Sequence, residues 1–171
     1  MSHSSGARLA PRLLPITLEG PAGPLEALLQ EHEAHDHKAT AVVCHPHPLY
    51  GGTMHNKVVH RAASVLHALG CAVLRFNFRG VGQSAGTHDR GVGEVEDARA
   101  ALQFLRLRYP GAHRIAAGFS FGSAIAAHLA AREPEIERLI LIAPAVDKAN
   151  FDILKSLSTP KLVLQGTADV T

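Results

Sequence analysis

A serine with a glycine two residues to either side is the clearest chemical signal in the sequence. Ser120 is the centre of residues 118–122, which read glycine-phenylalanine-serine-phenylalanine-glycine, between a strand-like run at 114–117 and a helix-like run at 123–132. A serine at a tight strand-to-helix turn is strained and exposed, and the helix that follows directs its first N–H groups at it. The pattern predicts a Ser120 nucleophile for acyl transfer, with the amide of Phe121 as one oxyanion donor. The alternative is a glycine-rich turn with only a structural role.

A nucleophilic serine also needs a base, an acid that orients the base, and a second oxyanion donor. Residues 45–52 form a loop between an expected buried strand and a helix, where such a second backbone donor is found. We assign this donor to the amide of His47, because Pro46 and Pro48 have no N–H. A His-x-His pair can also chelate a metal, but no cysteine or carboxylate cluster lies nearby in the sequence, so no metal site is expected.

A carboxylate follows the last expected strand. Asp169 lies in the loop at 166–169, where the orienting acid falls when the triad runs serine, acid, histidine along the chain; a surface turn is the alternative. The glycine-rich loop at 79–86 does not match the spacing of a dinucleotide-binding loop, so we expect no nucleotide and a loop that flanks the crevice of the site. His35 and His37 are expected in a solvated surface turn.

The composition is that of an ordinary globular protein. A chain of 171 residues suits one domain, which we place at 13–171 behind a flexible tail at 1–12. Lys and Arg number 17 against 15 Asp and Glu, and the basic residues are scattered, which indicates neither nucleic acid nor an anionic membrane as partner. No apolar run is long enough to span a membrane. Cys44 and Cys71 fall in or beside expected buried strands, which favours reduced thiols and a cytoplasmic location.

Strand and helix patterns alternate along the chain after an initial hairpin. Strands are expected at residues 13–18, 25–30, 39–44, 71–78, 113–117, 136–142 and 160–165. Helices are expected at residues 54–69, 94–108, 121–132 and 150–157. This order predicts an α/β fold with a mostly parallel central sheet, an antiparallel N-terminal hairpin and helices on both faces. Too few residues separate the last two strands to hold a large lid domain.

Together these features resemble the α/β-hydrolase superfamily, and most closely its small lidless bacterial serine hydrolases. Those proteins carry a histidine-proline-histidine-proline loop, then R-F-N-F-R-G-V-G-x-S, then G-F-S-F-G, and this chain has the three motifs at residues 45–48, 75–84 and 118–122. The resemblance covers about residues 13–171. It implies the α/β-hydrolase fold and hydrolysis of a small ester or thioester by Ser120, with Asp169 as the acid and no cofactor.

The chain departs from this group near its end. The resemblance implies a catalytic histidine downstream of the acid, yet none of the 12 histidines follows Asp169 and the sequence ends at Thr171. We therefore expect a C-terminally truncated chain that lacks the final strand and helix and is nearly inactive. His45 and His47 lie at the correct end of the sheet to replace the base, but nothing evident in the sequence would orient either ring.

Two readings compete with a hydrolase that acts on a small-molecule acyl substrate. One is a non-catalytic binding protein with the same fold, which the missing histidine favours. The other is an inactive fragment that forms a homo-oligomer through its last strand. Residues 161–164 would lie at an edge of the sheet, where unpaired N–H and C=O groups favour association.

Overall fold

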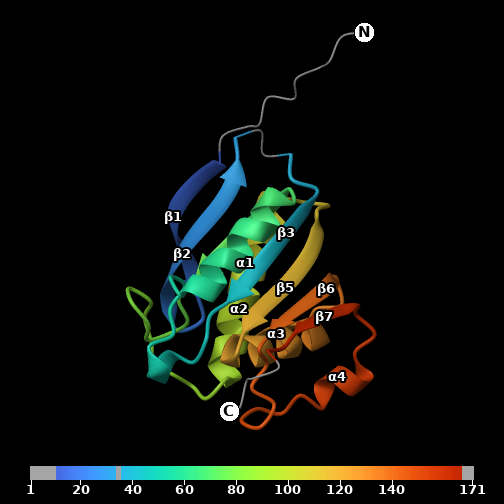
Figure 1. Ribbon diagram of the computed structural model, residues 1–171. Coiled ribbons are helices and arrows are strands. Elements are labelled where there is room, and N and C mark those ends of the chain that lie inside the picture. The colour runs from blue at the N-terminus through green and yellow to red at the C-terminus, as the bar shows by residue number, and fades with distance from the viewer. Residues whose placement is uncertain (1–10, 34–35, 167–171) are drawn as a thin grey trace.

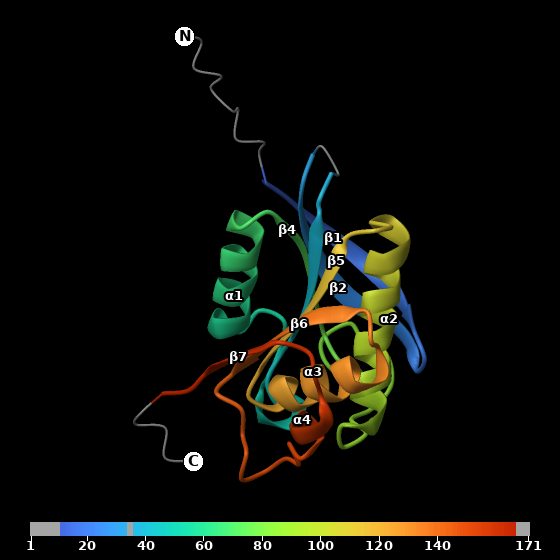
Figure 2. The same ribbon diagram turned by 90° about the vertical axis from the view of Figure 1, so that its right-hand side faces the viewer.

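The protein is built around one mostly parallel sheet, shown from two sides in Figures 1 and 2. The computed structural model describes residues 11–33 and 36–166, which contribute seven strands in the order β1-β2-β4-β3-β5-β6-β7. β2 pairs antiparallel with β1 and with β4, and the other neighbouring strands are parallel. The strands are β1 (Pro11–Gly20), β2 (Gly23–His32), β3 (Ala39–Cys44), β4 (Cys71–Phe76), β5 (His113–Phe119), β6 (Ile136–Ile142) and β7 (Lys161–Leu164). The predicted fold class, with its antiparallel N-terminal hairpin, is confirmed.

Helices cover both faces of this sheet. Figure 2 shows α1 (Lys57–Ala68) on one face, and α2 (Val92–Arg108) and α3 (Phe121–Arg132) on the other. α1 packs on a small apolar cluster with β3 and β4, whereas α2 and α3 bury the larger cluster on the opposite side. A 3₁₀ turn, η1 (Pro48–Tyr50), and the short α4 (Ile153–Ser156) lie in the connections. In the part of the chain described, no helix is long and apolar enough to cross a bilayer.

Most elements lie where the sequence predicts them, and β3, α3 and β6 have the predicted bounds. The helix predicted at 54–69 begins at Lys57, because the side chain of Asn56 accepts hydrogen bonds from the first-turn amides of Val58 and Val59. The N-terminal hairpin is longer than predicted. Its register continues to residues 11 and 12, which we had assigned to the tail, because both pair with the end of β2.

The two cysteines match their prediction. Cys44 and Cys71 are buried free thiols at the end of β3 and the start of β4. Burial disfavours the charged thiolate and raises the pKa of each side chain. These thiols therefore act as small packed apolar groups rather than as nucleophiles.

His37 is buried, and the solvated turn predicted for it is wrong. Its Nε2 accepts a hydrogen bond of 2.9 Å from the amide of His32, and its Nδ1 donates one of 2.9 Å to the carbonyl of Gly70. The rings of His32 and His67 pack beside it. These contacts join β2 to the turn after α1, a tertiary arrangement that the polar local sequence did not indicate. His35 lies outside the described residues.

Candidate active site

Ser120 occupies a strained turn between β5 and α3. Its backbone has φ 54° and ψ −117°, a conformation that a residue with a side chain rarely adopts. Two hydrogen bonds hold the turn: the Ser120 amide donates to the carbonyl of Ile142 at 2.9 Å, and the Ser123 amide donates to the carbonyl of Ser120 at 2.9 Å. The serine predicted from the motif therefore lies at the turn that the motif requires, half-buried at the end of the sheet.

The two glycines of the motif allow the backbone to pass close to this turn. A Cβ atom at Gly118 would lie 2.0 Å from the carbonyl oxygen of Gly122. A Cβ atom at Gly122 would lie 2.3 Å from the carbonyl oxygen of Cys44 and 2.6 Å from that of His45. These are contacts with main-chain atoms, which cannot move aside as a flexible side chain can. The glycine spacing is thus a packing requirement of the turn.

Ser123 is a second serine of the turn, which the motif alone did not identify. Its buried hydroxyl lies 2.8 Å from the carbonyl oxygen of Gly118 and 3.1 Å from that of Ile142. It thereby joins the first turn of α3 to the ends of β5 and β6. A small hydroxyl residue three positions after a predicted nucleophile is the signal that would have found it.

The amides of Phe121 and His47 have the properties of a pair of oxyanion donors. Within residues 11–33 and 36–166, neither N–H has a hydrogen-bond acceptor. Phe121 begins α3, where the first amides of a helix are unpaired, and His47 precedes η1. The carbonyl of His47 accepts hydrogen bonds from the amides of Tyr50 and Gly52, each at 3.1 Å, which fixes the loop.

His45 is a structural residue. Its ring is fully buried, with Nδ1 2.7 Å from the carbonyl oxygen of Pro46 and Nε2 3.0 Å from the amide nitrogen of Phe78. Nδ1 therefore carries the proton and donates, while Nε2 accepts. Burial lowers the pKa of His45 to about 4. With both nitrogens engaged and the neutral form favoured, His45 is not a free base for Ser120.

The motif at 75–84 supports the site from beneath. Arg75 donates to the carbonyl of Met54 at 2.8 Å, and the side-chain oxygen of Asn77 accepts from the Met54 amide at 2.8 Å. Both side chains are buried. They hold the chain between η1 and α1 against the end of β4, so these motif residues position the loop that carries His47.

The rest of this motif is tied to the N-terminal hairpin. Ser84 accepts a hydrogen bond of 2.9 Å from the amide of Glu26 in β2 and donates one of 2.6 Å to the carbonyl of Asn77. The loop at 79–86, which we expected to flank the crevice, is therefore anchored on β2. Four of the residues that follow it line the cavity instead: His88, Arg90, Gly91 and Val92.

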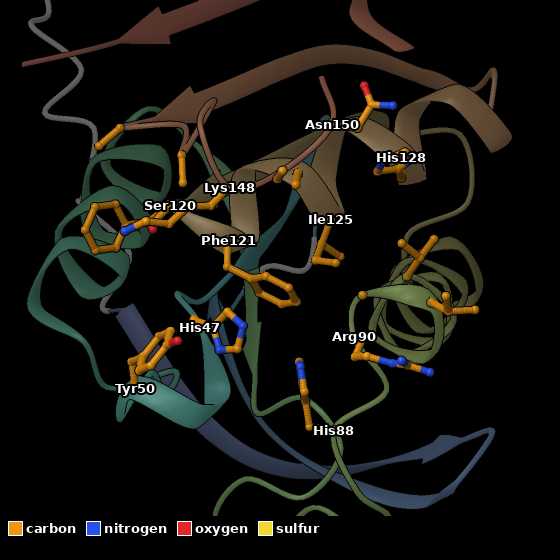
Figure 3. Close-up of a pocket in the computed structure, with 18 of the residues that line it drawn as sticks. His47, Tyr50, His88, Arg90, Ser120, Phe121, Ile125, His128, Lys148 and Asn150 are labelled. Carbon is orange, nitrogen blue, oxygen red and sulfur yellow. The ribbon is translucent and has the colours of Figure 1, made fainter. Parts of the chain in front are cut away.

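A cavity of about 810 Å³ opens above Ser120. It is lined by residues from the loops after β3, β4 and β6 and from α2 and α3, several of which Figure 3 shows around the opening. In the described part of the chain three non-glycine residues have positive φ: Arg90 at 53°, Ser120 at 54° and Ala143 at 43°. All three line this cavity. Strained backbone is concentrated at functional sites, so this observation identifies the cavity as the candidate active site.

The structure brings three of the four predicted site residues to one cavity. Ser120, Phe121 and His47 line it together, and Figure 3 shows the ring of Phe121 beside that of His47, with 4.7 Å between the ring centroids. Asp169 lies outside the described residues. Within those residues, no group of three or more histidine, cysteine or acidic side chains is arranged to hold a metal ion.

The comparisons with known proteins show the family and the fold. Residues 35–163 match the family described as serine aminopeptidase S33. An uncharacterized protein of Rickettsia prowazekii is 44% identical over 158 residues, which cover 90% of this chain and 66% of the relative. The chain thus spans just under two thirds of the length of that relative.

Three solved structures show the same fold at higher coverage. A putative α/β hydrolase from Agrobacterium tumefaciens is 37% identical, with a TM-score of 0.84 over 90% of this chain and 70% of the other. A serine hydrolase without a lid from Xanthomonas campestris is 42% identical, with a TM-score of 0.82 over 91% and 71%. An α/β serine hydrolase homologue from Coxiella burnetii is 40% identical, with a TM-score of 0.81 over 90% and 73%.

Proposed function

This chain belongs to the serine aminopeptidase S33 family, and from this premise we propose that it is a serine hydrolase that cleaves a small ester or thioester through an acyl-enzyme on Ser120. Its solved relatives include an α/β serine hydrolase without a lid, which supports an open site for a small acyl substrate. The proposal concerns the whole protein, since the chain spans 66% of its Rickettsia relative.

The reaction has two steps, acylation of Ser120 and hydrolysis of the acyl-enzyme. The Ser120 oxygen attacks the carbonyl carbon of the substrate while its proton passes to a base, and the amides of Phe121 and His47 stabilise the oxyanion that forms. The bond to the leaving oxygen or sulfur breaks, the leaving group takes the proton, and the acyl group remains on Ser120. Water then attacks the acyl-enzyme, which releases the carboxylic acid and restores the hydroxyl. We assign orientation of the base to Asp169.

One observation carries the proposal. Ser120 has a rare, strained backbone conformation, lies at a helix N-terminus, and lines one cavity with Phe121 and His47, whose amides have no acceptor in the described residues. A structural turn needs neither the strain nor the unpaired donors. Both are features of a site that stabilises a developing negative charge.

The test is covalent labelling of the full-length protein with a fluorophosphonate probe, followed by a series of p-nitrophenyl esters of rising acyl length. We expect an adduct on Ser120, release of nitrophenolate, and loss of both in Ser120→Ala. The matched control is Ser64→Ala on α1, whose hydroxyl bonds the carbonyl of His60 at 2.9 Å and does not line the cavity. An unlabelled Ser120 in the full-length protein would favour the competing interpretation, a non-catalytic binding protein.

A further inference from the structure

The candidate active site is cationic. Its described lining residues include Arg90, Arg132 and Lys148, and no aspartate or glutamate. Three histidines, His47, His88 and His128, line it as well. A cavity that carries one sign of charge raises the local concentration of ligands of the opposite sign. The lining therefore favours a substrate with a negative charge separate from its ester.

Arg90 and Lys148 are the lining cations available to such a charge. Arg132 donates to Glu96 at 2.6 Å and is committed to that ion pair. Arg90 and Lys148 are exposed, and within the described residues neither has a carboxylate within ion-pair distance.

The acidic residues near these two cations do not line the cavity. Asp89 lies 3.9 Å from Arg79, and Glu94 is fully buried. Asp147 is an exposed neighbour of Lys148 in the sequence. Glu94 does contact the lining, because its Oε1 lies 2.8 Å from Nδ1 of His88, but no carboxylate of the described residues pairs with Arg90 or Lys148.

The backbone holds Arg90 in a conformation that its side chain does not favour. Arg90 has φ 53°, in the left-handed region, where glycine and asparagine are more common. The buried carboxylate of Glu94 fixes this turn by accepting the amides of Asp89 at 2.8 Å and Gly91 at 2.7 Å, one on each side of Arg90. A strained residue that neighbouring contacts force into place beside a cavity indicates a positioned functional side chain.

Apolar side chains line the cavity between Ser120 and Arg90. Figure 3 shows Phe121 and Ile125 between Ser120 and Arg90, and Val92 and Val95 also line the cavity. A short hydrocarbon chain would pack on these side chains while a carbonyl group lies at Ser120 and a charged end lies at Arg90. The chemistry of the wall thus fits an acyl chain with a polar terminus.

We propose that Arg90 binds an anionic group of the substrate, so that the site selects esters or thioesters that carry a separate carboxylate or phosphate. Lys148 contributes to the same positive field. This inference rests on the proposed function of Ser120. It makes Arg90 a specificity residue, which contacts the substrate away from the reacting carbonyl.

The kinetic test compares two esters of equal acyl length in the full-length protein, mono-p-nitrophenyl glutarate and p-nitrophenyl valerate. We expect wild type to have the higher kcat/KM for the glutarate ester, and Arg90→Asn to lower the glutarate-to-valerate ratio about tenfold, since a charge-assisted hydrogen bond is lost. Asparagine tolerates the left-handed region, so the variant should fold. Arg90→Lys keeps the charge and should retain most of the glutarate-to-valerate ratio of wild type. Arg61→Gln, an exposed cation on α1 that does not line the cavity, should leave it unchanged.

A binding measurement separates this inference from the proposed function. Ligand-observed NMR compares monomethyl glutarate with methyl valerate on Ser120→Ala, with and without Arg90→Asn. Weaker glutarate binding in the double variant supports the anion site even if no ester is hydrolysed. Equal binding of the two ligands, or a kinetic ratio that Arg90→Asn does not change, overturns it while leaving the hydrolase proposal intact. Competition by glutarate and by inorganic phosphate shows which anion the site prefers.

Discussion

At the scale of single residues, a methyl group at position 122 has no room. The nearest atoms to it are the carbonyl oxygens of Cys44 and His45, which belong to the end of β3 and the loop after it. We predict that Gly122→Ala lowers the free energy of unfolding by about 1–3 kcal/mol through overpacking. It should also abolish fluorophosphonate labelling, because α3 must move away from β3 and carries the Phe121 amide with it. Urea unfolding and probe labelling measure the two effects.

Gly70→Ala is the matched control for that substitution. A Cβ atom at Gly70 meets nothing within 4 Å, but its φ of 95° is unfavourable for alanine. The change should cost about 1 kcal/mol and leave labelling intact. If the two variants lose the same stability and both keep their labelling, close packing is not the reason for glycine at position 122.

His45 makes stability depend on pH. Burial lowers its pKa from the ordinary 6.5 to about 4, so the unfolded chain takes up the proton first as the pH falls. The stability from a neutral His45 is complete above pH 6.5 and is lost between pH 6.5 and 4. The loss amounts to roughly 3 kcal/mol by the linkage relation. We predict that Tm falls over this interval.

The variant His45→Gln isolates the contribution of this ring. Its amide oxygen can still accept the hydrogen bond from Phe78, but it has no proton to gain. The pH slope of its Tm should be shallower than that of wild type, although its Tm at neutral pH is lower. Titration of His67, whose pKa burial also lowers, affects both proteins equally and cancels in the comparison. Identical slopes would contradict the prediction.

The sequence predicted three residues that line the cavity better than the residues that support them. Ser120, Phe121 and His47 were identified because a turn motif and the absence of proline N–H groups are local properties. Arg75 was known only as part of a motif, since its partner, the carbonyl of Met54, is brought to it by folding. The position of Arg90 in the site was not predicted, because left-handed backbone there is imposed by Glu94.

At the scale of elements, one ion pair fixes α2 to the loop after β4. Arg79 donates to both oxygens of Asp97, at 2.8 Å and 3.0 Å, and its amide donates to the same carboxylate at 2.9 Å. These hydrogen bonds raise the pKa of Arg79, and the Asp97 side chain is fully buried. We predict that Asp97→Asn lowers the free energy of unfolding by about 3 kcal/mol, because the largely buried guanidinium of Arg79 loses its paired carboxylate and keeps only Asp89, 3.9 Å away.

Arg99→Gln is the control for this ion pair. Arg99 lies on the same helix and donates to Glu133 at 2.6 Å, but its side chain is 58% exposed. Loss of an exposed pair should cost less than about 1 kcal/mol. Urea unfolding of the two variants measures the difference. Comparable losses would mean that burial does not explain the contribution of the Arg79–Asp97 pair to the free energy of unfolding.

The existence and type of the elements followed from hydrophobic period, while their ends depended on tertiary contacts. α3 has the predicted bounds because the turn at Ser120 starts it. The strand predicted at 71–78 ends at Phe76, and the Phe78 amide donates to the ring of His45 instead of to a carbonyl of a neighbouring strand. The hydrophobic periodicity of a sequence does not indicate where a backbone amide leaves the sheet to bond a side chain.

In the whole molecule, the site lies at the carboxyl ends of the parallel strands. β3, β5 and β6 are parallel, so their carboxyl ends lie together, and the loops that follow them carry His47, Ser120 and Ala143. Ligands bind at this edge in open α/β sheets. Residues distant in the sequence become neighbours because of the strand order. The alternation of strands and helices predicted a mostly parallel sheet but not the order of its strands.

β7 forms one edge of the described sheet. It is the terminal strand of the sheet in Figure 1 and has the apolar sequence of an interior strand. Its Leu162, Val163 and Leu164 side chains are nevertheless 52%, 50% and 49% exposed. A parallel strand is normally covered on both faces, and an exposed apolar edge pairs with another chain. We predict that the 171-residue chain associates with a second copy through β7, with an average mass that rises with concentration in sedimentation velocity.

A single charge should weaken that association. Val163→Lys places a cation on the pairing edge and should shift the chain toward monomer at every concentration. Val65→Lys, the same change at a residue of α1 that is 48% exposed, should not. Because the two variants alter charge and exposed apolar area alike, a difference between them assigns the contact to the strand. A wild-type chain that is monomeric throughout the series would instead show that exposed apolar side chains on β7 do not suffice for pairing.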